Sequence, residues 1–204
     1  MAAIVFDPLG INCAYYEAHA EDFCRKTAAV LLDDIYQPFL KLLPADAHIL
    51  DAGCGSGRDS LAFMKRGFHV TAIDASPAMV RVARSSGVEA RVLAFQDMNF
   101  LVEFDGLWAC ASLLHVPHSE MADVLNRFRR ALHSQGVLYL SLKEGTGERV
   151  AEDGRFFSYF TFDEFSDQLA REGSFEIIEA WKRAHPDSSG TVRTWLNFLA
   201  RKTS

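Results

Sequence analysis

Three glycines at alternate positions, Gly53, Gly55 and Gly57, follow a short apolar run in the segment HILDAGCGSGRDS. Ile49 and Leu50 are typical of the end of a buried strand, and the apolar residues after position 60 are typical of a helix. Glycine lets the chain turn between the two and lets a ligand lie against bare backbone. The unpaired N–H groups and the dipole of the helix favour an anionic group there.

Two ligand classes that use such a loop fit this sequence poorly. A nucleoside triphosphate site would require G-x-x-x-x-G-K-[ST], but the loop continues into Arg58 and Asp59. A dinucleotide site would require a third glycine at position 58, where a large cation would work against close helix–strand packing. The class that remains is a nucleoside that carries a charged amino-acid end in place of phosphate.

An acidic residue follows each of three successive apolar runs: Asp51, Asp74 and Asp97. Asp74 lies 19 residues after Gly55, the distance at which an acid can accept hydrogen bonds from ribose hydroxyls. The carboxyl ends of parallel strands meet at one edge of a sheet, and open α/β folds bind ligands there. We therefore expect the three carboxylates at one ligand-binding edge.

The segments ILDAGCGSG, VTAIDASPAMV and LAFQDM resemble the first three motifs of the class I S-adenosylmethionine-dependent methyltransferases, a resemblance that extends from about residue 49 to the C-terminus. It implies an S-adenosylmethionine cofactor whose methionine part lies near Gly53 and Gly55. It also implies that Asp74 binds the ribose, that Asp97 contacts the adenine amino group and that Asp51 supports the loop. The residues implied to sandwich the adenine are Ala75, Met79 and Met98.

Methyl transfer requires alignment of the acceptor with the methyl group, and removal of a proton where the acceptor carries one. The segment WACASLLHVPHSE leaves the fourth expected strand, and it places Ser112 and His115 next to the expected methyl position. The near-neutral reference pKa of histidine suits a general base. The alternative for His115 is a packing or capping role under the loop.

The N-terminal segment NCAYYEAHAEDFCRKT is similar to the mobile segment that closes over the cofactor in many small-molecule methyltransferases. Tyr15, Tyr16 and Arg25 are candidates to contact the methionine carboxylate or the acceptor; the alternative is an ordinary amphipathic helix. Arg58 is a further candidate for the carboxylate. Its alternative role is a surface salt bridge with Asp59.

The segment from Leu142 to Thr161 shows no strong periodicity, and loops of that length in compact domains are usually lids or disordered. Its charged residues, among them Lys143 and Arg155, are candidates to bind a polar substrate. Phe156 and Phe157 are expected in the core instead.

Apolar runs alternate with amphipathic stretches from His48 onward, which predicts an α/β fold: a Rossmann-like, seven-stranded, mostly parallel sheet with helices on both faces. Two terminal runs joined by AHPDSSG predict an antiparallel C-terminal hairpin. Thr161 and Glu164 predict a capping box. The other predicted strands are 48–52, 69–74, 90–95, 105–111 and 136–142, and the predicted helices are 15–32, 33–43 (capped by Asp33 or Asp34), 58–66, 77–85, 119–132 and 161–171.

With 204 residues, 49% of them hydrophobic, the chain predicts a single domain over 1–204, with an N-terminal helical cap (1–47) and a Rossmann-like core (48–204). A net charge of −6 makes a nucleic-acid partner an unfavourable expectation. The four cysteines have no metal-binding spacing, so no metal is expected. We find no signal peptide and no membrane-length apolar run, which predicts a cytoplasmic protein.

These patterns predict a methyltransferase that acts on a small molecule. The [DN]-P-P-[FYW] sequence of enzymes acting on amide or base nitrogens does not follow the fourth strand, and no P-C nucleophile of the cytosine C5 type occurs. Two alternatives remain: a tRNA-modifying methyltransferase, and a non-catalytic module that binds S-adenosylmethionine or S-adenosylhomocysteine. The sequence identifies neither the acceptor nor the oligomeric state.

Overall fold

The structure is a computed structural model that describes residues 6–28, 30, 32–171, 175–187 and 189–203. The strands of its main sheet are β1 (His48–Ala52), β2 (His69–Asp74), β3 (Ala90–Val92), β4 (Phe104–Ala109), β5 (Leu132–Lys143), β8 (Phe175–Pro186) and β9 (Val192–Lys202). The helices are α1 (Pro8–Thr27), α2 (Asp33–Leu40), α3 (Arg58–Met64), α4 (Pro77–Ser85), α5 (His118–Ala131) and α6 (Phe162–Arg171), with short 3-10 helices η1 (Phe95–Asp97) and η2 (Leu113–His115).

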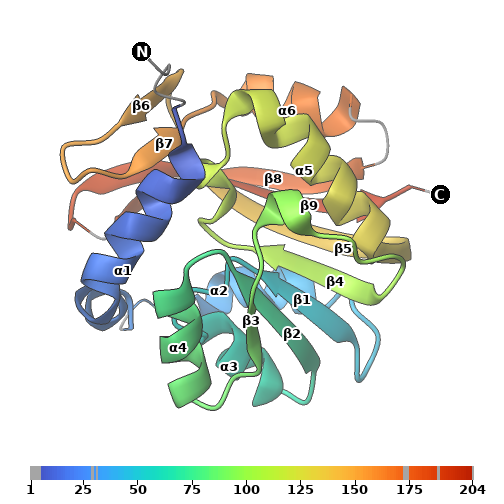
Figure 1. Ribbon diagram of the computed structural model, residues 1–204. Coiled ribbons are helices and arrows are strands. Elements are labelled where there is room, and N and C mark those ends of the chain that lie inside the picture. Colours follow the sequence, from blue (N-terminus) through green and yellow to red (C-terminus); the bar gives the residue numbers. More distant parts are fainter. Residues whose placement is uncertain (1–5, 29, 31, 172–174, 188, 204) are drawn as a thin grey trace.

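The seven strands follow the order β3-β2-β1-β4-β5-β9-β8 (Figure 1). Strands β1 to β5 run parallel, and β9 pairs antiparallel with β5 on one side and with β8 on the other. The predicted Rossmann-like sheet with a C-terminal antiparallel hairpin is confirmed. The chain moves outward from β1 to β3 and then returns to β4 beside β1, so a crevice forms at the carboxyl ends of these two strands.

Alternate residues of the strands pack on opposite faces of the sheet, because successive side chains of a strand point to opposite sides. Ile49 and Trp108 pack with residues of α2 and α3 in one buried cluster. Their neighbours Leu50 and Leu107 belong to a second cluster with α5 and α6. The runs are apolar throughout because helices cover both faces.

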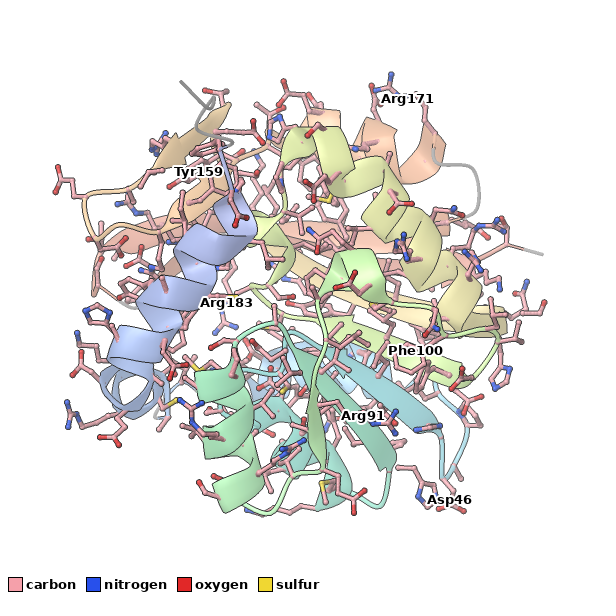
Figure 2. The ribbon with its side chains drawn as sticks, viewed as in Figure 1. Asp46, Arg91, Phe100, Tyr159, Arg171 and Arg183 are labelled. Carbon is pink, nitrogen blue, oxygen red and sulfur yellow. The ribbon has the colours of Figure 1, made fainter. Side chains whose placement is uncertain are left out.

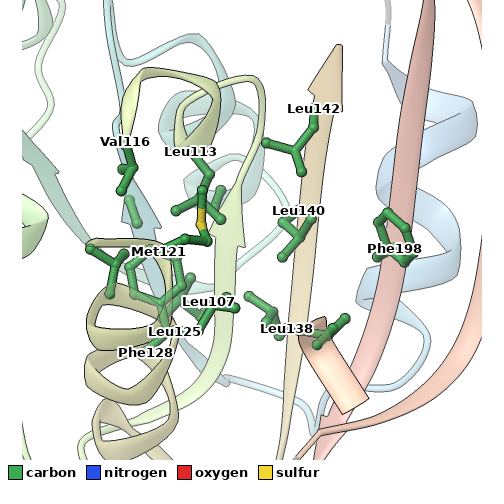
Figure 3. Packing of buried hydrophobic residues seen from close by; sticks show 14 of the residues in the cluster. Leu107, Leu113, Val116, Met121, Leu125, Phe128, Leu138, Leu140, Leu142 and Phe198 are labelled. Carbon is green, nitrogen blue, oxygen red and sulfur yellow. The ribbon is translucent and has the colours of Figure 1, made fainter. Parts of the chain in front are cut away.

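Helix α5 shows how the second face is filled. Met121, Leu125 and Phe128 are spaced four and then three residues apart, so they form an apolar stripe on one side of the helix. They pack with Leu107 and Leu138 of the sheet, and all five side chains are buried (Figure 3). Truncation of such a residue, for example Leu125→Ala, costs about 2–5 kcal/mol.

Helix α1 begins earlier than predicted, at Pro8 rather than near Tyr15. The Asp7 carboxylate accepts a hydrogen bond from the Gly10 amide at 2.9 Å, and Pro8 occupies the first helical turn, where its missing N–H is not needed. The helix ends at Thr27, five residues before the predicted end. In Figure 1 it lies between α4 and the hairpin of β6 (Glu148–Val150) and β7 (Phe156–Ser158), at the edge of the sheet where β1 and β4 end.

The predicted cap of α2 is wrong. Leu32 occupies the N-cap position and provides no side-chain hydrogen bond. Asp33 instead forms an ion pair with Arg66, and Asp34 forms one with Arg183 at 3.0 Å. Both carboxylates lie in the first turn of the helix, where a negative charge interacts favourably with the positive end of the helix dipole.

Two further segments differ from prediction. The expected strand 90–95 ends at Val92, and the chain then enters η1. The expected irregular segment after β5 contains the hairpin β6–β7, whose residues Phe156 and Phe157 are buried as predicted.

The capping box is confirmed, because the Glu164 carboxylate accepts hydrogen bonds from both the amide and the hydroxyl of Thr161 at 2.9 Å. No helix within the described ranges is long and apolar enough to span a membrane.

Candidate functional site

A cavity opens at the carboxyl ends of β1, β2 and β4, next to α1. We call it the first cavity. It contains most of the residues that the sequence singled out, although they come from eight different elements or loops. The predicted site residues that line it are Tyr16, Gly53, Gly55, Arg58, Asp74, Ala75, Met79, Ser112 and His115.

The glycine loop exposes backbone to this cavity. Gly53, Gly55 and Gly57 have φ angles of 81°, 54° and 80°, in the left-handed region that side chains disfavour. A Cβ at Gly53 would lie 2.3 Å from the Cβ of Ser112, so a side chain cannot fit there. A Cβ at Gly55 would have no atom within 4 Å, so this residue leaves open space on the cavity side of the loop.

Asp74 is held in the first cavity by two backbone hydrogen bonds. Its Oδ2 accepts from the Gly55 amide at 2.9 Å and its Oδ1 accepts from the Ser76 amide at 2.8 Å. An ionised carboxylate offers about four lone-pair positions, so each oxygen can accept a further hydrogen bond. Burial raises the pKa of Asp74, and the two amides partly offset that rise. The carboxylate is thus oriented with acceptor capacity left for a ligand.

Asp97 and Met98 do not line the cavity. Asp97 is exposed at the end of η1, and Met98 is buried in the core with 1% exposure. Gln96 lines the cavity in their place, together with Phe95 and Leu93. The short 3-10 helix η1 interrupts the extended backbone after β3, so the side chains no longer alternate as in a strand and Gln96 takes the place expected for Asp97. The pattern of apolar and acidic residues in the sequence does not indicate this turn.

Asp51 lies beneath the glycine loop rather than in the cavity. It is 2% exposed, and its Oδ2 accepts a hydrogen bond from the Ser60 hydroxyl at 2.5 Å. Burial and the nearby charge of Asp59 raise the pKa of Asp51 to about 7. The bond joins the end of β1 to the first turn of α3, across the loop.

Arg58 forms an ion pair with Asp59, and the pair is largely buried rather than on the surface. Asp59 accepts from Arg58 Nε at 2.6 Å, from the Tyr36 hydroxyl at 2.7 Å and from Trp108 Nε1 at 2.8 Å. Burial acts to raise the pKa of Asp59, but these partners, Arg58 first, hold it below its usual value. Arg58 lines the first cavity from this fixed position.

Tyr16 and His115 meet where α1 faces the end of β4. The Tyr16 hydroxyl lies 3.0 Å from His115 Nε2, and His115 Nδ1 lies 2.8 Å from the Phe156 carbonyl oxygen. A carbonyl only accepts, so Nδ1 carries the proton and Nε2 accepts from the tyrosine. Burial lowers the pKa of His115 to about 3 and raises that of Tyr16 to about 12.

A second link ties α1 to the same hairpin, and sequence reasoning missed it. The buried Asn12 side chain accepts from the Phe156 amide at 2.9 Å and donates to the Phe156 carbonyl oxygen at 3.2 Å. An asparagine on a helix gives no local sign of a partner 144 residues away. Arg25, another N-terminal candidate, is exposed and pairs with Asp22, so it does not reach the cavity.

A second cavity lies beside the first and shares Tyr16, Arg58 and His115 with it. We refer to it as the second cavity. Its further walls come from β5, β7, β8 and β9 and from the segment between β6 and β7. They include Tyr139, Ser141, Lys143, Arg155, Phe157, Arg183 and Trp195.

Residues 49–136 match the family described as a methyltransferase domain. These residues, less than half of the chain, are similar to methyltransferase domains. A ubiquinone biosynthesis O-methyltransferase of Xylella fastidiosa is 36% identical over 105 residues, which are 47% of this chain and 41% of that protein. The chain therefore spans less than half the length of this curated relative.

Solved structures share the fold of this chain. A SAM-dependent methyltransferase of Methanosarcina mazei has a TM-score of 0.75 at 23% identity, over 85% of this chain and 98% of that one. The 1,6-didemethyltoxoflavin-N1-methyltransferase of Burkholderia thailandensis, solved with 1,6-didemethyltoxoflavin and S-adenosylhomocysteine, has a TM-score of 0.73 at 22% identity, over 100% and 94%. Both structural matches cover more of the chain than residues 49–136, the part that matches the family.

Proposed function

We propose that this protein transfers a methyl group from S-adenosylmethionine to a small-molecule acceptor. The observation that carries the proposal is that two cavities meet at Tyr16 and His115. The first cavity has the features of a nucleoside site, and the second cavity is lined by aromatic and charged side chains. Methyl transfer needs two ligands aligned at one point, and this junction offers such a point.

The first cavity fits S-adenosylmethionine. The open space at Gly55 gives room for a ligand against the backbone, and Asp74 has acceptor capacity for ribose hydroxyls. Met79 and Phe95 offer apolar surface for a base. When bound, the sulfonium supplies an electrophilic methyl group.

The chain's own residues would position the reactants and exclude water. Tyr16 and Asn12 hold α1 against the end of β4 and the β6–β7 hairpin, which covers the junction of the cavities. His115 as general base stays a prediction. With Nε2 occupied by the Tyr16 hydroxyl and its pKa low, His115 can take a proton only after that hydrogen bond is exchanged for one from the acceptor.

Four features support a small acceptor over tRNA. The negative net charge disfavours a polyanion, and α1 narrows the approach to the junction. The cations of the second cavity lie inside it, paired with acids, rather than on an extended face. The curated relative is named as an O-methyltransferase of ubiquinone biosynthesis. A cytoplasmic location remains a prediction.

Calorimetric titration tests the cofactor, and a labelled-methyl screen tests the reaction. We expect both S-adenosylmethionine and S-adenosylhomocysteine to bind, and we expect label to pass into a metabolite fraction. Binding of both without any transfer would favour the non-catalytic module, and label in tRNA would favour the tRNA enzyme. Binding of NADH and of neither sulfur nucleoside would refute the assignment.

A further inference from the structure

The second cavity has an unequal distribution of charge on its walls. Five cationic side chains line it, against one acidic side chain, Asp187. Each cation has an acidic partner, but four of those partners lie outside the cavity lining. Cations that face a low-dielectric cavity while their counter-charges lie behind them create a positive potential inside it. The five cations are Lys26, Arg58, Lys143, Arg155 and Arg183, the last of which is labelled in Figure 2.

Lys143 is one of the two most buried of these cations, with Arg155. It stands at the last position of β5 and is 6% exposed. Its Nζ donates to Asp187 Oδ2 at 3.0 Å, and within the part of the chain that the structure describes this carboxylate is its one hydrogen-bond acceptor. An ammonium group has three donors, so two N–H groups remain for a ligand.

Aromatic rings surround this ammonium group. Lys143 Nζ lies 4.3 Å from the ring centre of Phe157 and 5.7 Å from that of Trp195, and both rings line the second cavity. The Arg155 guanidinium carbon lies 4.9 Å from the centre of the same Phe157 ring. Rings of this kind can stack on a flat ligand, while buried cations bind a negative group with strong, charge-assisted hydrogen bonds.

We propose that the methyl acceptor is a flat, conjugated molecule that carries a negative charge at neutral pH, and that Lys143 is the residue that recognises this charge. The inference rests on the proposed function and makes it specific. The charge can come from a carboxylate or from an ionised ring hydroxyl. Both offer an anionic oxygen to the two uncommitted N–H groups.

Matched ligand pairs test the proposal on the full-length protein saturated with S-adenosylhomocysteine. Hydroxybenzoic acids are compared with their amides, and nitrophenol above its pKa is compared with nitroaniline, by calorimetric titration. We expect the charged member of at least one pair to bind about tenfold more tightly than its neutral partner. A preference confined to the acids identifies a carboxylate, and one confined to nitrophenol identifies an ionised hydroxyl. Equal affinities in every pair, or no binding of any probe, would overturn the proposal.

Variants assign the preference to one residue. Lys143→Met should reduce it to about twofold or less, whereas Lys143→Arg should retain most of it. Asp187 remains compensated in these variants, because Arg193 lies 3.5 Å away and the Ser189 amide donates at 2.9 Å. Lys65→Met, which removes an exposed lysine of the α3 C-terminus, is the control and should change nothing.

The two proposals fail in different ways. If S-adenosylhomocysteine binds to the wild type and to Lys143→Met equally, but the charge preference survives in Lys143→Met, then the role of Lys143 is wrong and the proposed function stands. If S-adenosylhomocysteine does not bind to the wild type, the proposed function itself is wrong.

Discussion

The hydroxyl of Tyr16 lies 3.0 Å from Nε2 of His115, and this contact joins the N-terminal helix to the end of β4 across 99 residues of sequence. Both side chains line both cavities. A ligand that moves α1 must therefore break this bond, and a ligand that replaces the tyrosine must offer His115 another donor.

Tyr16→Phe should remove the donor and leave Nε2 of His115 free. We expect the pKa of His115 to rise toward its ordinary value, because a donated hydrogen bond favours the neutral ring. The free energy of unfolding should fall by about 0.5–1.5 kcal/mol. NMR titration of the histidine ring protons measures the first effect, and Tyr15→Phe is the control. An unchanged titration would show that the contact does not persist in solution.

His115→Ala should slow methyl transfer about 10²-fold or more if the residue is the base, while affinity for S-adenosylmethionine stays unchanged. Initial rates under saturating donor, together with calorimetric affinities, make the comparison. A normal rate would assign His115 to packing and to the support of Tyr16.

The stability of the protein should also depend on His115 at acidic pH. Its folded pKa of about 3 lies below the ordinary 6.5, so between these values the unfolded chain binds a proton that the folded chain does not. The stability contribution is therefore complete above about pH 6.5 and decreases as the pH falls toward 3. On going from neutral to mildly acidic pH, the free energy of unfolding in urea should fall less for His115→Gln than for the wild type, by at most about 1.4 kcal/mol per pH unit, the limit for one proton. Identical losses would contradict the burial of a neutral ring.

Asp74→Ala should weaken binding of S-adenosylmethionine by roughly 1.5–3 kcal/mol, because it removes the acceptor proposed for the ribose hydroxyls. This corresponds to a loss of about 10- to 150-fold in affinity. Asp167→Ala, on the exposed surface of α6, is the control and should bind normally. Wild-type affinity in Asp74→Ala would refute the placement of the ribose.

The glycine loop provides a paired test of space against backbone strain. Gly55→Ala and Gly67→Ala both place a side chain at a positive φ with no atom within 4 Å, and each should cost about 1–2 kcal/mol of stability. Of these two glycines, Gly55 lines the first cavity and Gly67 does not, so Gly55→Ala alone of the two should also weaken binding of S-adenosylmethionine. Gly53→Ala should be much less stable than either, because its Cβ would overlap Ser112. Equal affinities in the Gly55 and Gly67 variants would show that the ligand does not approach the loop.

Local patterns predicted the parts of this molecule whose causes are local. The spacing from Gly55 to Asp74 places a loop and an acid at adjacent strand ends, and the structure joins them by a hydrogen bond. The capping box of Thr161 and Glu164 is likewise written within one helical turn. Asp97 was expected in the cavity by position, but a 3-10 turn brings Gln96 there instead.

Contacts between distant segments could not be predicted in this way. Asn12 and Phe156 meet because α1 crosses the edge of the sheet, and Lys143 meets Asp187 because the loop after β8 returns to the end of β5. Neither residue type nor spacing indicates these pairs, since each depends on the packing of whole elements. The same is true of Leu32, which takes the cap position expected for Asp33 or Asp34; both acids instead form ion pairs with distant arginines.

The strand order divides the molecule into two areas with β4 between them. The glycine loop and Asp74 belong to the half formed by β1, β2 and β3, whereas Lys143, Arg183 and Trp195 belong to the half formed by β5, β9 and β8. Substitutions at the tip of the terminal hairpin are therefore expected to alter which ligand the second cavity prefers without disturbing the first cavity. An engineer could diversify that hairpin as a library and keep the first three strands constant.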